Sequence, residues 1–130
     1  MSFFQKLGDI FNPESESRAD FGWRSINDDD ALREIVMASN TKPQVIYKHS
    51  TRCATSFFAL KNVQRISGEG RKKADFYMVD VIGQRTLSFQ VAELLGIHHE
   101  SPQLIILKDG EVCWHGAHQN VGAEAVEVNI

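Results

Sequence analysis

The chain has 130 residues, of which 42% are hydrophobic and 24% are charged. This length fits one domain with a hydrophobic core, and the composition excludes both a disordered chain and a membrane-embedded one. The net charge of −3 argues against a nucleic-acid partner, because proteins held by phosphate contacts usually have a strongly basic face. Two cysteines, Cys53 and Cys113, are too few for a disulfide-stapled scaffold or a four-cysteine zinc site.

The sequence has no apolar run long enough to cross a bilayer, and its N-terminus lacks the pattern of a secretory signal. We therefore expect a cytoplasmic protein. In that reducing compartment a cysteine is a free thiol by default.

The N-terminal segment is predicted to be an amphipathic helix that is separate from the main domain. A polar run follows Pro13, so we divide the chain into a helix and tether over residues 1–18 and a domain over residues 19–130. Membrane binding is disfavoured because Lys6 is the only cation in the helix, whereas interfacial helices usually carry a basic face. Docking on the chain's own domain and a homodimer through residues 3–11 both stay open. The apolar side of this helix is formed by Phe3, Phe4, Leu7, Ile10 and Phe11.

The domain is expected to begin with a short strand over residues 21–26, followed by a helix. Asn27 or Ser25 can cap this helix, and Asp28–Asp30 fall in its first turn. Carboxylates favour the positive end of the helix dipole, so this acidic run has a structural explanation and we assign it no chemistry. The helix ends near Asn40, before a proline.

Two strand–helix units follow. A buried strand over residues 44–47 precedes a helix from about Cys53 to Ile66. A second strand over residues 76–79 precedes a helix that ends at Gly96, a residue favoured at that position. Between the two units we expect residues 68–73 to form a loop with solvated cations, because its glycines lack the rest of any phosphate-binding pattern.

The last part of the chain predicts a β-hairpin. Residues 104–107 and 112–114 flank Asp109-Gly110, which is a strong hairpin signal, and a short helix near residues 123–128 closes the chain. A strand–helix–strand order requires a parallel pair with a right-handed crossover, and the hairpin adds antiparallel strands. We therefore predict an α/β fold with a mixed central sheet and helices on both faces.

Cys53 lies where the first core strand ends and the next helix begins. The first amides of a helix have no partner within it, so a thiolate there gains hydrogen-bond donors and its pKa should fall below about 8.5. Ser56 stands where a dithiol enzyme would carry its second cysteine, which predicts exchange through one thiol. Arg52 and His49 could each add positive charge, and His49 could equally be a core or strand-end histidine. The alternative is that Cys53 is a small buried apolar residue, but its polar neighbours disfavour this.

A second signal is Ser101-Pro102, directly before the apolar strand over residues 103–107. Proline is tolerated at the entry of a strand because it donates no ladder hydrogen bond. A cis bond there would leave the preceding backbone open to pair with an extended substrate.

Three blocks of the sequence stand out together, namely Lys48–Ser56, His99–Gln103 and Gly110–His115. In this order they resemble the monothiol bacilliredoxins, thioredoxin-fold stress proteins of the bacterial cytoplasm. The resemblance covers about residues 21–130. It implies a thioredoxin-like fold, a cis Ser101–Pro102 bond and Cys53 as the nucleophile. It also implies the removal of a small thiol such as bacillithiol from mixed disulfides on client proteins. That thiol would be a co-substrate, and no cofactor is expected.

On this interpretation Cys53 acts with Ser56, Arg52 and the nearby amides, which stabilise the thiolate. The family usually has proline after the cysteine; Ala54 stands there instead and can offer an additional N–H donor. The residues expected to contact a client are Thr51, Ala54, Thr55, Ser101 and Pro102.

Cys113 is a candidate resolving cysteine. In the sheet order that the resemblance implies, one strand separates its strand from that of Cys53. Two strand spacings are about 10 Å, whereas the Cα atoms of a disulfide lie within about 7 Å. We therefore expect no disulfide between them and interpret Cys113 as a packing residue.

Metal binding and a non-catalytic role are the remaining alternatives. Four histidines, His98, His99, His115 and His118, could supply zinc ligands in number, but their spacing is poor and we expect no metal site. The rival function is a thioredoxin-like interaction module that acts through the N-terminal helix without catalysis.

Overall fold

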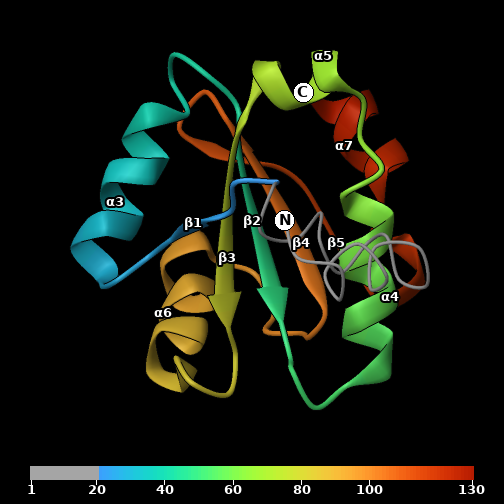
Figure 1. Cartoon of the computed structure of the whole chain (residues 1–130). Coiled ribbons are helices and arrows are strands. Elements are labelled where there is room, and N and C mark those ends of the chain that lie inside the picture. Colours follow the sequence, from blue (N-terminus) through green and yellow to red (C-terminus); the bar gives the residue numbers. More distant parts are fainter. Residues whose placement is uncertain (1–20) are drawn as a thin grey trace, which may run out of the picture.

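The computed structural model describes residues 21–130, in which helices cover both faces of a five-stranded sheet (Figure 1). The predicted α/β class is therefore confirmed. The helix and tether expected over residues 1–18 lie outside the described residues. Within the described part of the chain, no helix is long and apolar enough to span a membrane.

The elements follow the predicted order, with one additional helix. The strands are β1 (Arg24–Ser25), β2 (Gln44–His49), β3 (Asp75–Asp80), β4 (Gln103–Lys108) and β5 (Glu111–Ala117). The helices are α3 (Asp29–Ala38), α4 (Ala54–Val63), α5 (Gly68–Lys73), α6 (Arg85–Leu95) and α7 (Ala123–Asn129), with a short 3₁₀ helix η1 (His118–Asn120) before the last.

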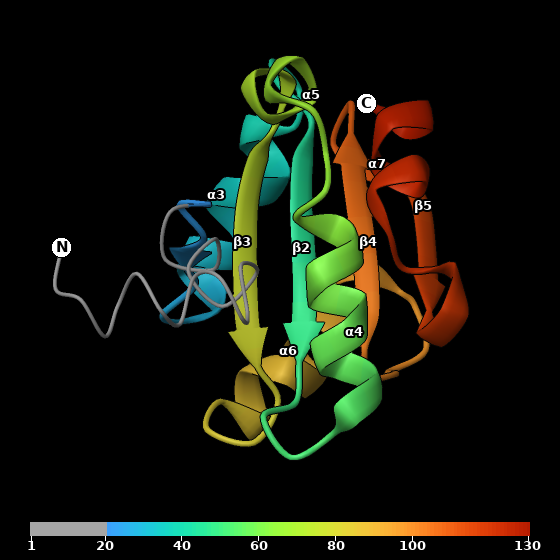
Figure 2. The same ribbon diagram turned by 45° about the vertical axis from the view of Figure 1, so that its right-hand side comes forward.

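The sheet has the strand order β1-β3-β2-β4-β5. β2 pairs in parallel with β3 and antiparallel with β4, so the sheet is mixed as expected. α4 and α7 cover one face and α3 and α6 cover the other, which Figure 2 shows with α4 in front of the strands and α3 behind them. β2 and β4 are central, and nearly all their residues are buried.

Each face of the sheet has its own hydrophobic core. The core under α4 and α7 contains buried side chains from β2, β3 and β4, namely Val45, Tyr47, Phe76, Leu104 and Ile106, together with Leu60, Val63 and Val126 from the helices. The core under α3 and α6 contains Ile46, Val79, Ile105 and Leu107 from the same strands, with Leu32, Ile35, Leu87 and Val91 from the helices. The alternation of side chains along each strand produces this division.

The predicted hairpin joins β4 and β5. Asp109 and Gly110 both have positive φ, 56° and 81°, as a two-residue turn of type I′ requires. The antiparallel register changes between Ile106 and Leu107, which pair with Trp114 and Val112. Cys113 is therefore the extra residue of a β-bulge.

The first strand is shorter than predicted and the cap of the first helix is different. Only Arg24–Ser25 pairs with β3, because Gly22 has a φ of 82° and turns the chain. The ring of Phe21 instead lies 4.7 Å from that of Trp23. The cap of α3 is Asp28, whose side chain accepts a 2.8 Å hydrogen bond from the amide of Ala31. The prediction that Asn27 or Ser25 caps this helix was therefore wrong. The next residue, Asp28, has a carboxylate that can accept the same kind of hydrogen bond, and the helix begins after it.

Residues 68–73 form helix α5, so the prediction of a loop was wrong. Ser67 caps this helix, since its hydroxyl accepts a 3.1 Å hydrogen bond from the amide of Gly70. The side chain of Glu127, far along the chain, accepts a hydrogen bond of 3.0 Å from the amide of Ser67. The cations lie in the last turn, where the helix dipole favours them. Arg71 is also not simply solvated, because its guanidinium lies 4.3 Å from the centre of the Phe21 ring.

Candidate functional site

The candidate site lies at the end of the sheet toward which β2 and β3 run (Figure 1). β4 is antiparallel to β2 and therefore begins at this end. Lys48 near the end of β2 pairs with Gln103 at the start of β4. The residues that follow β2, including Cys53, and the residues that precede β4, including Pro102, consequently meet at one end of the sheet.

Cys53 is the N-cap residue of α4 and has extended backbone angles, φ −118° and ψ 119°. Its amide donates to the carbonyl of Ser50 at 3.3 Å, and its carbonyl accepts the first helical hydrogen bond from Phe57, also at 3.3 Å. The amides of residues 54–56 have no acceptor within the helix. The thiol is partly exposed to solvent. This is the position at a helix start that the sequence predicted.

The pKa of the Cys53 thiol is lowered. The largest influence is a hydrogen bond from the amide of Ser56; partial burial of the thiol opposes it, and the amide of Thr55 and the hydroxyls of Thr55 and Ser56 lower the pKa further. Each of these groups donates a hydrogen bond more strongly to a thiolate than to a thiol. Arg52 is not among the groups that lower this pKa, and its role at the site stays a prediction.

Ser56 is completely buried. Its hydroxyl makes no hydrogen bond of normal geometry to any described residue, which agrees with its being the smallest of the influences named on the Cys53 pKa. Its carbonyl accepts a 2.6 Å hydrogen bond from the hydroxyl of Tyr47. The Nδ1 atom of His49 lies 3.4 Å from the same hydroxyl, and His49 is itself buried. His49 is thus a buried strand-end histidine beside Tyr47, which is one of the two interpretations left open above.

The other predicted residues of the Cys53 loop are on the surface. Thr51, Arg52, Ala54 and Thr55 are all exposed, so a client chain could reach them. Two aromatic side chains one turn further along α4, Phe57 and Phe58, are also exposed.

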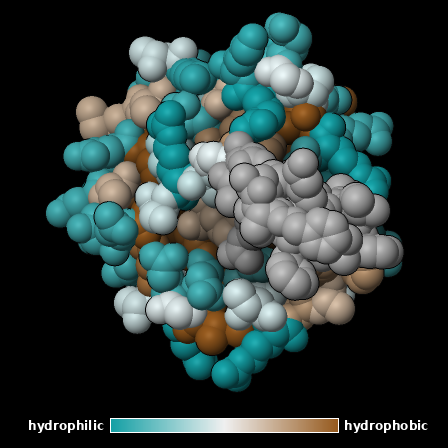
Figure 3. Space-filling model, in the orientation of Figure 1, coloured by the Kyte–Doolittle hydropathy of each residue, from teal (hydrophilic) through white to brown (hydrophobic). Residues whose placement is uncertain are grey.

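On the α6 side of the same end, Ile82 and Phe89 are exposed. Figure 3 shows hydrophobic surface at the lower end of the molecule, toward which β2 and β3 run. The site therefore has apolar as well as polar surroundings.

The peptide bond between Ser101 and Pro102 is cis, as the resemblance implies. Pro102 is buried and its carbonyl accepts a 3.2 Å hydrogen bond from the amide of His118. The hydroxyl oxygen of Ser101 is buried without a hydrogen-bond partner among the described residues. Both predicted client-contacting residues therefore lie at the same end of the sheet as Cys53.

Sequence reasoning missed three polar residues that lie beside the site and not in it, Tyr47, Lys48 and His99. Lys48 is completely buried and its Nζ atom lies 3.0 Å from Nδ1 of His99. A signal was present, since a lysine within an apolar strand and a tyrosine in a buried strand both require polar partners. The sequence does not say which partners those are.

Cys113 is exposed, so its interpretation as a packing residue was wrong. Its Sγ atom donates a hydrogen bond of 3.6 Å to the carbonyl of Asn129. The β-bulge explains the exposure, because the extra residue interrupts the alternation of side chains along the strand. Although the residue as a whole is exposed, partial burial of its sulfur raises the pKa of this thiol, the opposite of the shift at Cys53. Both cysteines are free thiols. As expected, β4 lies between β2, which precedes Cys53, and β5, which contains Cys113.

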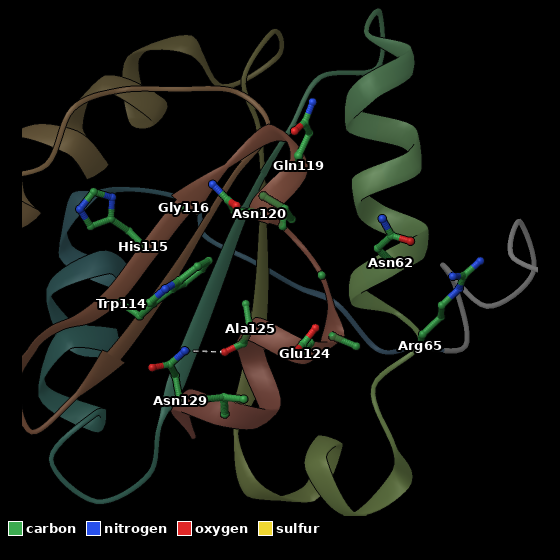
Figure 4. A pocket seen from close by; sticks show the side chains of 14 residues that line it. Asn62, Arg65, Trp114, His115, Gly116, Gln119, Asn120, Glu124, Ala125 and Asn129 are labelled. Atoms are coloured by element: carbon green, nitrogen blue, oxygen red, sulfur yellow. Dashed lines mark hydrogen bonds between the residues drawn. The ribbon is translucent and has the colours of Figure 1, made fainter.

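An open cavity of about 770 Å³ lies elsewhere, between the second half of α4, β5, η1 and α7. Figure 4 shows Trp114 pointing into this space, whereas His115, the next residue on β5, points away from it. Its lining includes neither Cys53 nor Pro102. Within the described residues no three His, Cys, Asp or Glu side chains are grouped so that they could hold a metal ion.

The fold resembles solved structures with a thioredoxin fold. A candidate oxidoreductase with this fold is 24% identical, with a TM-score of 0.69, over 81% of this chain and 90% of that chain. A thioredoxin of Malassezia sympodialis is 20% identical, with a TM-score of 0.60, over 83% of this chain and 90% of that one. A thioredoxin of Fasciola hepatica is 14% identical, with a TM-score of 0.63, over 82% and 99%.

These similarities define the class as a thioredoxin fold, with one cysteine at the start of the helix that follows β2. The family model described as Monothiol bacilliredoxin BrxC matches residues 24–126. The chain belongs to the monothiol bacilliredoxin family. The resemblance noted in the sequence, and the thioredoxin-like fold that it implies, are thereby confirmed.

Proposed function

We propose that this protein is a cytoplasmic thiol–disulfide oxidoreductase that removes a low-molecular-weight thiol, of the bacillithiol type, from mixed disulfides on client proteins. One observation carries the proposal: Cys53 is a partly exposed thiol whose pKa is lowered by the amides at the start of α4. A thiolate is the nucleophile of disulfide exchange, and a lowered pKa increases its fraction at neutral pH. Membership of the monothiol bacilliredoxin family supports the same chemistry.

The reaction needs two exchange steps. The Cys53 thiolate attacks the small-thiol sulfur of the mixed disulfide, so that a disulfide forms between Cys53 and the small thiol and the client cysteine leaves as a thiolate. A second molecule of the small thiol, as its thiolate, then attacks that sulfur. This step releases the symmetrical small disulfide and regenerates the Cys53 thiolate. Overall, one free small thiol is oxidised into the symmetrical disulfide and the client cysteine is reduced to its thiol.

The surroundings of Cys53 fit a single-thiol mechanism. Ser56 provides a hydroxyl donor where a second cysteine would resolve the intermediate internally. Cys113 lies two strands away from β2 in the sheet, and its raised pKa makes it a poorer nucleophile at neutral pH. The external thiol is therefore the proposed resolving agent, and no cofactor takes part.

The test compares the two cysteines in matched variants. Cys113→Ser leaves only Cys53, and Cys53→Ser leaves only Cys113. We expect the alkylation rate of Cys53 by iodoacetamide to titrate with an apparent pKa below that of a free thiol, about 8.5, and that of Cys113 above it. Only the Cys113→Ser variant should release a small thiol from a peptide mixed disulfide. Mass spectrometry of the protein from its host under oxidant stress should show a small-thiol adduct on Cys53.

The same measurements test the alternative function, a non-catalytic interaction module. If Cys53 titrates at or above the free-thiol value and no exchange occurs, the domain is a non-catalytic interaction module. In that case deletion of residues 1–18 should abolish its partner contacts, including any homodimer through residues 3–11.

A further inference from the structure

Lys48 is a buried cation with no counter-ion among residues 21–130. It is completely buried on the face of the sheet that α6 covers. No carboxylate of the described residues lies within ion-pair distance of its Nζ atom. Its hydrogen-bond partner is Nδ1 of His99, at 3.0 Å. Burial alone lowers the pKa of Lys48 to about 8, so the amine still carries its proton for the most part at neutral pH.

The surroundings of the His99 imidazole favour its role as the acceptor of this hydrogen bond. The hydroxyl of Ser88 on α6, also buried, lies 3.4 Å from the same Nδ1 atom, and the ring of Phe89 lies 4.5 Å from the imidazole. Burial and the neighbouring charge of Lys48 lower the pKa of His99. The imidazole is therefore neutral at neutral pH, and its unprotonated nitrogen can accept from the Lys48 ammonium.

A second anchor holds the same loop from β4. The side-chain amide of Gln103 donates to the carbonyl of His98 at 2.9 Å, and its oxygen accepts from the amide of Glu100 at 3.4 Å. Gln103 and Lys48 are directly paired across β2 and β4, so their side chains point to the same face. Residues 97–102, which end in Ser101 and Pro102, are thus tied to both central strands.

We propose that Lys48, acting through His99, is a positioning residue that fixes the 97–102 loop for client binding. This inference rests on the proposed function, and it assigns to Lys48 a role in the recognition of protein clients rather than in the reactivity of Cys53. A methionine would fill the same space without the cost of burying a charge, so stability alone gives no reason for a lysine here. The hydrogen bond that the ammonium makes to the loop gives that reason.

The decisive variant is Lys48→Met in the full-length protein. We expect its melting temperature at neutral pH to equal or exceed that of the parent, because a buried charge is removed. Its rate with hydroxyethyl disulfide, a small disulfide that does not need the loop, and the pH profile of Cys53 alkylation should stay unchanged. The second substrate is a peptide whose single cysteine forms a mixed disulfide with the amino acid cysteine. The rate of Lys48→Met with this peptide should fall roughly tenfold, as expected for the loss of one hydrogen bond to a charged group. Lys72→Met, at an exposed position of α5, is the matched control and should change neither rate.

His99 provides a second, independent pair of variants. His99→Leu removes the acceptor and should reproduce the loss with the peptide, whereas His99→Asn retains an acceptor near the Nδ1 position and should restore most of the rate. The double variant Lys48→Met/His99→Leu should lose no more than either single variant, because both changes break one hydrogen bond. Amide hydrogen exchange of residues 97–103 measures local opening of the loop directly. The exchange should be faster in Lys48→Met than in the parent.

The outcomes separate this inference from the proposed function. If the parent protein fails to react with the peptide mixed disulfide, the proposed function is wrong, and hydrogen exchange still decides whether Lys48 holds the loop. If the parent reacts and Lys48→Met retains the peptide rate to within about twofold, the positioning role is overturned. A parallel fall of both rates would also overturn it, because the effect would then lie in Cys53 and not in client binding.

Discussion

The hydroxyl of Tyr47 donates a 2.6 Å hydrogen bond to the carbonyl of Ser56, and both residues are completely buried. This bond joins the middle of β2 to the first turn of α4, three residues after Cys53. The amide of Ser56, on the other side of the same residue, is the largest influence that lowers the Cys53 pKa. The strand therefore helps to hold in place Ser56, the residue whose amide has the largest influence on the thiolate.

Removal of the Tyr47 hydroxyl should weaken this connection. In Tyr47→Phe the free energy of unfolding should fall by about 1 kcal/mol, the usual net value of one hydrogen bond. Urea unfolding followed by circular dichroism measures this change. Tyr77→Phe, on the partly exposed neighbouring strand, is the control. An unchanged free energy of unfolding in Tyr47→Phe would show that the bond contributes nothing net.

Ser56→Ala separates the hydroxyl of Ser56 from its amide. We expect the pKa of Cys53 to rise, but only slightly, because the amide that has the larger influence remains. The free energy of unfolding should not fall, since the buried hydroxyl that is lost has no partner among the described residues. The pH dependence of iodoacetamide alkylation measures the first effect, in a Cys113→Ser background so that only one thiol reacts. A pKa that does not move would remove the hydroxyl from the list of groups that stabilise the thiolate.

Lys48 should make the stability of the protein depend on pH in the alkaline range. Burial lowers its pKa from 10.5 to about 8. Between these values the unfolded chain binds more protons than the folded one, so the contribution of Lys48 to the free energy of unfolding rises with pH. The stability advantage expected of Lys48→Met should therefore be largest below pH 8 and shrink toward pH 10.5. Urea unfolding across this range, compared with Lys72→Met, measures it; an advantage that is constant with pH would contradict the shift.

Two glycines of α5 should respond in opposite directions to the same substitution. A Cβ atom at Gly70 would lie 2.7 Å from Cγ1 of Ile66, which is buried, so Gly70→Ala forces that core side chain to move. Nothing lies within 4 Å of a Cβ atom at Gly68. Gly68→Ala should raise the free energy of unfolding by up to about 1 kcal/mol through helix propensity, and Gly70→Ala should lower it. Thermal melts of the two variants decide this, and equal melting temperatures would mean that Ile66 adjusts freely.

Much of this protein can be predicted from local patterns. The alternation of strands and helices predicts the mixed sheet, and Asp109-Gly110 predicts its hairpin. A cysteine a few residues after a buried strand, where the next helix begins, predicts a thiol at the start of that helix. These features depend on residues that are near one another in the chain. The physical cause, such as a positive φ or an unpaired amide, is present within a few residues of the signal.

The tertiary structure alone decided the features that need a distant partner. Helix α5 is completed by Glu127 at the amide of Ser67, and Lys48 meets His99 only because β2 and β4 are neighbours. The sequence could show that a lysine in an apolar strand requires an acceptor, but not where that acceptor would come from. Burial and long-range hydrogen bonds depend on how elements assemble, and a pattern read along one stretch of chain does not contain that information.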